Sequence, residues 1–280
     1  MNTHALASSS PTLPGNSIPA VLNLSSADPL VPWSLPPSSL SLSPGDLHVW
    51  RFPLDLPPSS FQILASSLLP GEIARARRFV FASDHDHFIA ARGALRLLLG
   101  SYLRTPPAEV SLLKGPHGKP FLPPPSARGA EAPDLRFNLS HSHGLALCAF
   151  ALRSELGIDL EKFRPDFASA EIAGRFFSPA ERSELLSLSP DLHTRGFFNC
   201  WTRKEAYVKA RGQGLHIPLH SFDVSLAPGQ PPILRSADSA RWSLLSFSPA
   251  QDYSAALVAE GSDWNVRFFD LPPNLLPLAG

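Results

Sequence analysis

The stretch Gly157-Ile158-Asp159-Leu160-Glu161 alternates apolar with acidic residues. Side chains along a β-strand point to opposite faces in turn. The alternation therefore predicts a strand with Asp159 and Glu161 on one face and the two apolar side chains on the other. On this prediction, the two carboxylates point the same way.

A second segment, Trp201-Thr202-Arg203-Lys204-Glu205-Ala206-Tyr207-Val208-Lys209, has the pattern of an amphipathic helix. Its residues Trp201, Glu205 and Lys209 follow one another at intervals of four, so they share a helix face. The apolar stripe runs through Trp201 and Val208, and Glu205 falls inside that stripe. A carboxylate in such a position needs a partner.

Three carboxylates, Asp159, Glu161 and Glu205, would be brought together without a matching excess of local Lys or Arg. Such a set predicts a site for a hard cation such as Mg²⁺, which takes oxygen ligands. Two simpler interpretations stay open. The strand carboxylates could form the solvated face of an edge strand, and Glu205 with Lys209 could be an ordinary helix ion pair.

Further motifs stand in a fixed order around these two segments. Gly118-Lys119-Pro120 and Phe137-Asn138-Leu139-Ser140-His141-Ser142 precede them, and Gly212-Gln213-Gly214-Leu215 follows the helix. The ordered set, from roughly residue 46 to residue 260, resembles the Sfp-type 4'-phosphopantetheinyl transferases. That family carries a G-x-D-x-E strand and a W-x-x-K-E-A-x-x-x-K helix.

The resemblance implies roles for individual residues. Asp159, Glu161 and Glu205 would hold Mg²⁺, and Glu205 and Lys209 would be the catalytic groups. The contacts implied for coenzyme A are Arg75, Arg78, Lys119, Ser140, His141 and Lys209. Arg75 and Arg78 would bind the 3'-phosphate of coenzyme A. Taken alone, the arginines of this region, which include Arg77, could equally be a solvated helix face.

The alternation of helices and strands, with antiparallel-looking late strands, predicts an α+β fold. The resemblance implies a pseudo-twofold pair of similar halves, each a small sheet with a helix, over residues 46–153 and 154–270. Residues 1–45 contain 8 Pro and 11 Ser and one acidic residue, so we expect a disordered tail there. We also expect residues 271–280 to be loose.

Three local patterns predict individual elements. Helical spacing of apolar residues predicts helices over 84–102 and 192–211. Gly212 is placed to end the second of these helices. Ser178-Pro179-Ala180-Glu181 has the pattern of a capping box at a helix start, which accounts for Glu181 without a catalytic role.

The implied reaction moves the 4'-phosphopantetheine arm of coenzyme A to a serine of an apo acyl or peptidyl carrier protein and releases adenosine 3',5'-bisphosphate. Two rival hypotheses remain. A metal-dependent phosphodiesterase would use the same carboxylates, and a non-catalytic module would only bind carrier protein or coenzyme A. The implied partners are thus a carrier protein and coenzyme A, with a monomer as the default state.

Composition excludes some classes of function. The 280 residues carry 24 Lys plus Arg and 24 Asp plus Glu, so no overall charge attracts nucleic acid or a membrane surface. Two cysteines, Cys148 and Cys200, make neither a disulfide framework nor a zinc pattern. The first fifty residues lack Lys and Arg, unlike a secretory signal, and no apolar run is long enough to span a bilayer. We expect a cytoplasmic protein.

Overall fold

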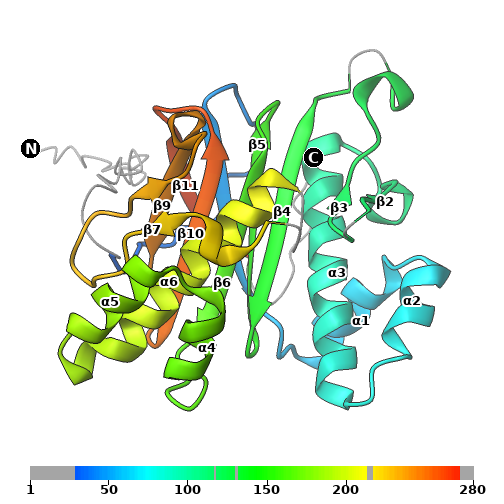
Figure 1. The fold of residues 1–280 in the computed structure, drawn as a ribbon. Coiled ribbons are helices and arrows are strands. Elements are labelled where there is room, and N and C mark those ends of the chain that lie inside the picture. The colour runs from blue at the N-terminus through cyan, green and yellow to red at the C-terminus, as the bar shows by residue number, and fades with distance from the viewer. Residues whose placement is uncertain (1–28, 117, 130–131, 213–216, 272–280) are drawn as a thin grey trace, which may run out of the picture.

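Two halves of the chain repeat one order of elements in this computed structural model, which describes residues 29–116, 118–129, 132–212 and 217–271. Each half has a strand, two short helices, a long helix, a two-stranded ribbon and an antiparallel strand pair (Figure 1). The first half comprises β1 (Asp46–Pro53), α1 (Pro58–Ser66), α2 (Pro70–Ala76), α3 (Ala82–Leu103), β2 (Leu113–Lys114), β3 (Pro120–Phe121), β4 (Leu135–Ser142) and β5 (Leu145–Leu152). The second comprises β6 (Leu156–Lys162), α4 (Ala170–Phe176), α5 (Pro179–Ser187), α6 (Pro190–Arg211), β7 (Asp223–Val224), β8 (Leu234–Arg235), β9 (Trp242–Phe247) and β10 (Tyr253–Glu260), and β11 (Asn265–Asp270) follows.

The two sheets also repeat one pairing order. The first sheet runs β1-β5-β4 and the second runs β6-β10-β9, with antiparallel pairing throughout these strands. β11 then leaves the second half and pairs in parallel with β1, from Asp46 opposite Asn265 to Arg51 opposite Asp270. The α+β class and the pair of similar halves are therefore confirmed. The division of the chain into separate domains stays a prediction.

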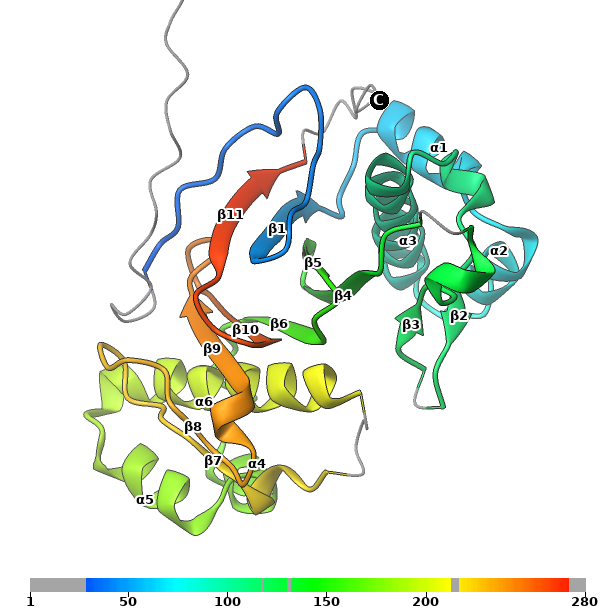
Figure 2. The same cartoon turned by 90° about the horizontal axis from the view of Figure 1, so that it is seen from above.

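Each long helix covers the outer face of one sheet, so the sheets lie between α3 and α6 (Figure 2). The inner faces of the two sheets share one apolar core, which contains Leu47 and Leu147 from the first sheet and Ile158 and Leu257 from the second. Burying apolar side chains from both sheets in one core holds the halves together.

The predicted helices are confirmed, and their ends follow the expected signals. α3 and α6 contain the ranges 84–102 and 192–211. Gly212 ends α6 with φ of 66°, a left-handed conformation that glycine adopts without steric cost. The capping box of α5 is present, because the Ser178 N–H donates to Glu181 Oε2 and the Glu181 N–H donates to Ser178 Oγ. The last motif residues, 213–215, lie outside the described residues.

Residues 29–45, part of the segment expected to be a tail, lie on the body of the molecule. Val31 is buried, and Trp33 packs edge-on against Phe268 with ring centroids 5.3 Å apart. Ser34 forms a parallel bridge with Phe269 in β11. This strap covers the open edge of β11, which would otherwise leave unpaired backbone groups. The expectations for residues 1–28 and 272–280 lie outside the described residues.

Candidate active site

The strand β6 and the helix α6 cross at Gly157. A Cβ atom on this residue would lie 2.2 Å from the Ala206 carbonyl oxygen and 2.3 Å from the Ala210 nitrogen. Only glycine therefore allows the backbones to approach so closely. The predicted alternation of β6 is present, but both of its faces are covered: Ile158 is buried in the shared core, and Asp159, which is 4% exposed, faces α6.

Lys209 of α6 binds the Asp159 carboxylate directly. Its Nζ donates to Asp159 Oδ1 at 2.5 Å, to Ser140 Oγ at 3.0 Å and to the Ile158 carbonyl oxygen at 3.2 Å. Ser140 Oγ in turn donates to Asp159 Oδ1 at 3.0 Å. The second oxygen, Asp159 Oδ2, is buried and has no hydrogen-bond partner among the described residues. A buried carboxylate oxygen without a partner is unusual, and this oxygen is a candidate ligand for a cation.

Glu161 and Glu205 lie within electrostatic range of the Asp159 carboxylate. Burial raises the pKa of the Glu205 carboxyl, and the negative charges of Asp159 and Glu161 raise it further, against the effect of Lys209. Burial and the charge of Asp159 likewise raise the pKa of Glu161. The carboxylates are therefore close enough to repel one another, so the region favours a cation.

Side chains of β4 join this strand to β6. The Asn138 side-chain oxygen accepts from the Ile158 N–H at 2.8 Å, Ser140 binds Asp159, and Ser142 Oγ donates to Glu161 Oε2 at 2.8 Å. These residues alternate along β4 just as the acidic residues alternate along β6. Two serine hydroxyls thus hold the two strand carboxylates in place, which is how groups around a metal site commonly orient its ligands.

His141 lies at the edge of this cluster. Partial burial lowers the pKa of its imidazole, and the positive charges of Lys209 and His87 lower it further, whereas Asp84 raises it. His87 and Asp84 belong to the first turns of α3. The helix of the first half therefore begins close to the site built on β6 and α6.

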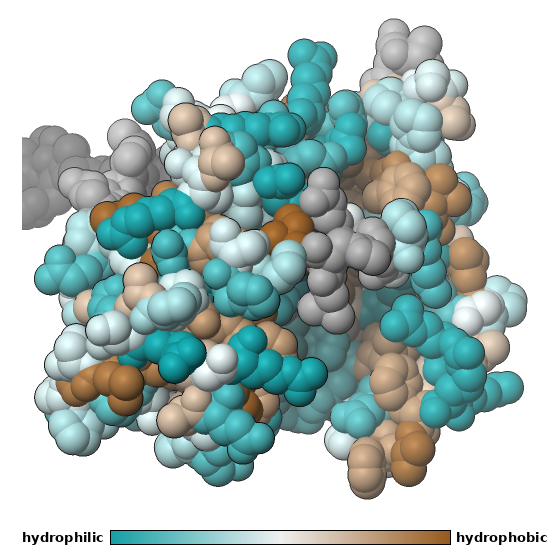
Figure 3. Space-filling model, viewed as in Figure 1, coloured by the Kyte–Doolittle hydropathy of each residue, from teal (hydrophilic) through white to brown (hydrophobic). Residues whose placement is uncertain are grey.

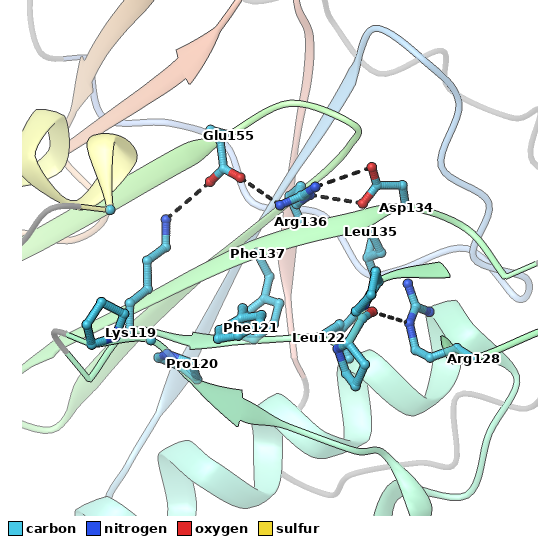
Figure 4. Close-up of a pocket in the computed structure, with 15 residues that line it drawn as sticks. Lys119, Pro120, Phe121, Leu122, Arg128, Asp134, Leu135, Arg136, Phe137 and Glu155 are labelled. Carbon is cyan, nitrogen blue, oxygen red and sulfur yellow. Dashed lines mark hydrogen bonds and ion pairs between the residues drawn. The ribbon is translucent and has the colours of Figure 1, made fainter. Parts of the chain in front are cut away.

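Lys119 lies at the junction of the two halves. Its Nζ donates to the carbonyl oxygens of Lys209 at 2.8 Å and Leu156 at 3.0 Å, and it lies 3.6 Å from Glu155 Oε2. Burial lowers the pKa of this ammonium group. Figure 4 shows Lys119 at one end of a row of ion pairs along a pocket of about 360 Å³; the row continues through Glu155, Arg136 and Asp134.

The other two predicted contacts of coenzyme A lie on α2 and just after it. Arg75 and Arg78 are both exposed, and the Arg75 guanidinium lies 5.0 Å from the centre of the Phe88 ring. Within the described residues, neither guanidinium group contacts the carboxylate cluster. The structure thus brings together Asp159, Glu161, Glu205, Lys209 and Ser140, with His141 beside them, and Lys119 reaches the end of α6.

In the ranges that the structure describes, no group of three or more His, Cys, Asp or Glu side chains is arranged to hold a metal ion. Asp159 Oδ1 is bound by Lys209 and Ser140, and Glu161 Oε2 is bound by Ser142. The predicted metal set therefore stays a prediction.

The sequence patterns assigned no role to two residues of the site, Asn138 and Ser142, or to Lys204 of the helix motif. Asn138 and Ser142 had a visible signal, the alternation N-x-S-x-S, but nothing showed which strand they would face. Lys204 of the helix motif is also structural: it is fully buried, pairs with Glu181 at 2.7 Å and donates to the Leu219 carbonyl oxygen. It joins α5 and α6 rather than entering the site.

Comparison with known proteins identifies the family. The model of the 4'-phosphopantetheinyl transferase superfamily matches residues 155–258, and the model of the N-terminal part of 4'-phosphopantetheinyl transferases matches residues 56–152. The 4'-phosphopantetheinyl transferase HetI of Nostoc sp. is 41% identical over 237 residues, which cover 85% of this chain and 97% of HetI. The 4'-phosphopantetheinyl transferase Sfp of Bacillus subtilis is 34% identical over 161 residues, covering 58% of this chain and 67% of Sfp.

The chain belongs to the 4'-phosphopantetheinyl transferase superfamily, and its resemblance to the Sfp type is confirmed. Among the described residues, no helix is both long and apolar enough to cross a membrane.

Proposed function

We propose that this protein transfers the 4'-phosphopantetheine arm of coenzyme A to a serine hydroxyl of an apo acyl or peptidyl carrier protein. One observation carries the proposal: Lys209 binds Asp159 where β6 crosses α6, and the charge of Asp159 also acts on Glu161 and Glu205. Family membership supports the choice of coenzyme A and a carrier protein as the two substrates. Adenosine 3',5'-bisphosphate would be the second product.

Asp159, Glu161 and Glu205 would hold Mg²⁺. The unpartnered oxygen Asp159 Oδ2 and the mutual repulsion of the carboxylates fit a divalent cation with oxygen ligands. When bound, Mg²⁺ would neutralise charge on the pyrophosphate of coenzyme A and stabilise the leaving group.

The reaction is attack of a hydroxyl oxygen on phosphorus, so the residues mainly orient the reactants and balance charge. Lys209 would donate to a phosphate oxygen and offset the charge that develops during transfer. Glu205, the carboxylate that α6 contributes to the site, would accept the proton of the attacking serine. A P–O bond forms between the serine oxygen and the phosphorus of the arm, the P–O bond to adenosine 3',5'-bisphosphate breaks, and the serine proton passes to Glu205.

The remaining contacts would bind the nucleotide part of coenzyme A. Arg75 and Arg78 are exposed and would pair with the 3'-phosphate, for which guanidinium groups are well shaped. His141 would donate to a phosphate at the end of β4, and Ser140 would join it by turning its hydroxyl from Asp159 to the phosphate. Lys119, which precedes β3 and contacts the end of α6, would add positive charge there. We further propose that the protein acts as a cytoplasmic monomer.

A carrier-dependent release of nucleotide tests this function against its rivals. Coenzyme A and Mg²⁺ are incubated with the protein, with and without an apo acyl carrier protein, and adenosine 3',5'-bisphosphate is quantified. The proposal expects release only when the carrier is present. Equal release without carrier would instead support a phosphodiesterase, and binding without release would support a binding module.

A further inference from the structure

The turn between α2 and α3 exposes three consecutive apolar side chains. Phe79, Val80 and Phe81 are 39%, 90% and 68% exposed. Hydrophobic residues gather at the lower right of Figure 3, over the lower end of α3, with hydrophilic residues around them. Contiguous exposed apolar surface with a polar rim commonly marks an interaction site.

The same turn is strongly basic. Arg75, Arg77 and Arg78 are exposed, and the stretch from residue 74 to residue 81 contains no acidic residue. The nearby carboxylate of Glu72 is already bonded to Arg92 and to Arg96. Glu72 therefore does not neutralise the three arginines. They outnumber the two exposed aspartates of the first turns of α3, Asp84 and Asp86, so the turn can attract a negatively charged partner.

This surface borders the candidate active site. His87, in the first turns of α3, binds Asp55 Oδ1 at 2.8 Å, and Leu54 donates to the Gly144 carbonyl oxygen at 2.8 Å in the turn after β4. These bonds fix the start of α3 beside the end of β4, which carries Ser140 and His141. Figure 3 shows a hollow between the lower end of α3 and the half that carries α4 and α6.

We propose that Val80, Phe81 and Arg77 form the docking surface for the carrier protein. The partner's matching face would be apolar with at least one carboxylate, which would cover Val80 and Phe81 and pair with Arg77. This inference rests on the proposed transfer function. It leaves Arg75 and Arg78 to the nucleotide, so the two substrates use different side chains of one basic turn.

The charge of the turn and its place beside the site both favour a carrier domain over other occupants. A carrier has to bring its serine to the carboxylates, and a surface on the rim of the hollow can hold the rest of that domain. Apolar side chains in the centre of an interface usually supply most of its affinity, while charged residues at its edge raise the rate of encounter.

Steady-state kinetics of three variants, Val80→Ser, Phe81→Ser and Arg77→Glu, test the proposal. Each should raise the KM for an apo acyl carrier protein about tenfold. The KM for coenzyme A and the kcat at saturating carrier should stay as in the wild type. Val80 and Phe81 are exposed, and serine is a favourable residue at the start of a helix, so folding should be preserved.

Two matched variants show whether a similar substitution at an exposed residue outside the proposed docking surface affects the carrier KM. Leu186→Ser replaces an apolar residue of α5 that is 72% exposed, and Arg104→Glu reverses an exposed charge after α3. Neither should change the KM for the carrier. In addition, higher salt should raise the carrier KM of the wild type more than that of Arg77→Glu, because salt screens exposed charges.

An unchanged carrier KM in the three variants would overturn the docking surface while leaving the transfer function intact. A rise in the KM for coenzyme A alone would assign the turn to the nucleotide and would also overturn it. A wild-type dimer that Val80→Ser converts to monomer would assign the apolar side chains to a second copy of the chain. Absence of transfer by the wild type would instead remove the proposed function and this inference with it.

Discussion

Lys209 Nζ donates to Asp159 Oδ1 at 2.5 Å, across the point where α6 passes over β6. This bond links the two motifs that the sequence places in separate elements. It also places the ammonium group of Lys209, which is proposed to bind phosphate, against the carboxylate of Asp159, which is proposed to bind Mg²⁺. The missing side chain of Gly157 makes the contact possible, because it lets the helix approach the strand.

Replacing Lys209 by glutamine should lower kcat/KM for transfer about 10² to 10³-fold, because a donor to the developing phosphate charge is lost. If the lysine only neutralised Asp159, excess Mg²⁺ would restore the rate. We expect no such rescue. Lys114→Gln, at an exposed lysine of β2, is the matched control and should keep full activity. Rates measured across a range of Mg²⁺ concentrations decide between the two roles.

Replacing Ser142 by alanine should weaken Mg²⁺ binding about 10 to 100-fold, because Ser142 holds the Glu161 carboxylate. Calorimetric titration with Mg²⁺ measures this directly. Ser142→Thr keeps the hydroxyl and should recover most of the affinity. Ser187→Ala removes a hydroxyl that, among the described residues, bonds only the Glu184 carbonyl oxygen of α5, and it should have no effect. Equal affinity in Ser142→Ala and the wild type would refute the orienting role.

Adding a methyl group at Gly157 should destabilise the fold by about 2 kcal/mol or more, because backbone atoms of α6 occupy the space. Gly174→Ala in α4 is the matched control, since a Cβ there meets nothing within 4 Å. It should be neutral or stabilise by up to about 1 kcal/mol. Urea unfolding of both variants tests the difference, and equal effects would show that the crossing is looser than described.

Buried His48 should make the protein less stable in acid. Burial lowers the pKa of its imidazole from 6.5 to about 4. Between these values the unfolded chain binds a proton that the folded protein excludes, so stability falls as the pH drops from about 6.5 to about 4, by about 3 kcal/mol in all. Above pH 6.5 this contribution does not change.

The His48→Asn variant has no such titration and serves as the reference. The difference in unfolding free energy between the wild type and His48→Asn should shrink or reverse between pH 7 and pH 4.5. A constant difference would mean that His48 titrates alike in the folded and unfolded chains.

Removal of residues 1–44 should cost about 3 kcal/mol more than removal of residues 1–28, because Val31 and Trp33 pack against the body. Thermal unfolding of the two truncated proteins measures the difference. Composition alone predicts no difference in stability, because it predicts that all of residues 1–45 form a disordered tail. Equal midpoints would favour that prediction over the packed strap.

Local patterns in the sequence predicted the elements that local forces determine. Four such elements could be predicted from the sequence: the helical period of α3 and α6, the glycine that ends α6, the capping box of α5 and the alternation along β6. In each case neighbouring residues satisfy the backbone or share one face, so spacing alone carries the information.

Contacts between segments distant in the sequence could not be predicted from residue spacing. The parallel pairing of β11 with β1 joins residues far apart in the chain, and no turn residue signals it. Ser140 was expected to contact a coenzyme A phosphate, whereas in this structure its hydroxyl donates to Asp159 and accepts from Lys209. That arrangement depends on which strand faces β4, and residue spacing within β4 does not specify it.

The mass of an apo acyl carrier protein after incubation with this protein, coenzyme A and Mg²⁺ tests the central claim most directly. The account predicts that the carrier gains one phosphopantetheine group, and that EDTA or Glu205→Gln abolishes the gain. A gain that survives both changes would contradict the roles given to the carboxylates. Coenzyme A cleavage with no gain on the carrier would contradict the transfer reaction itself.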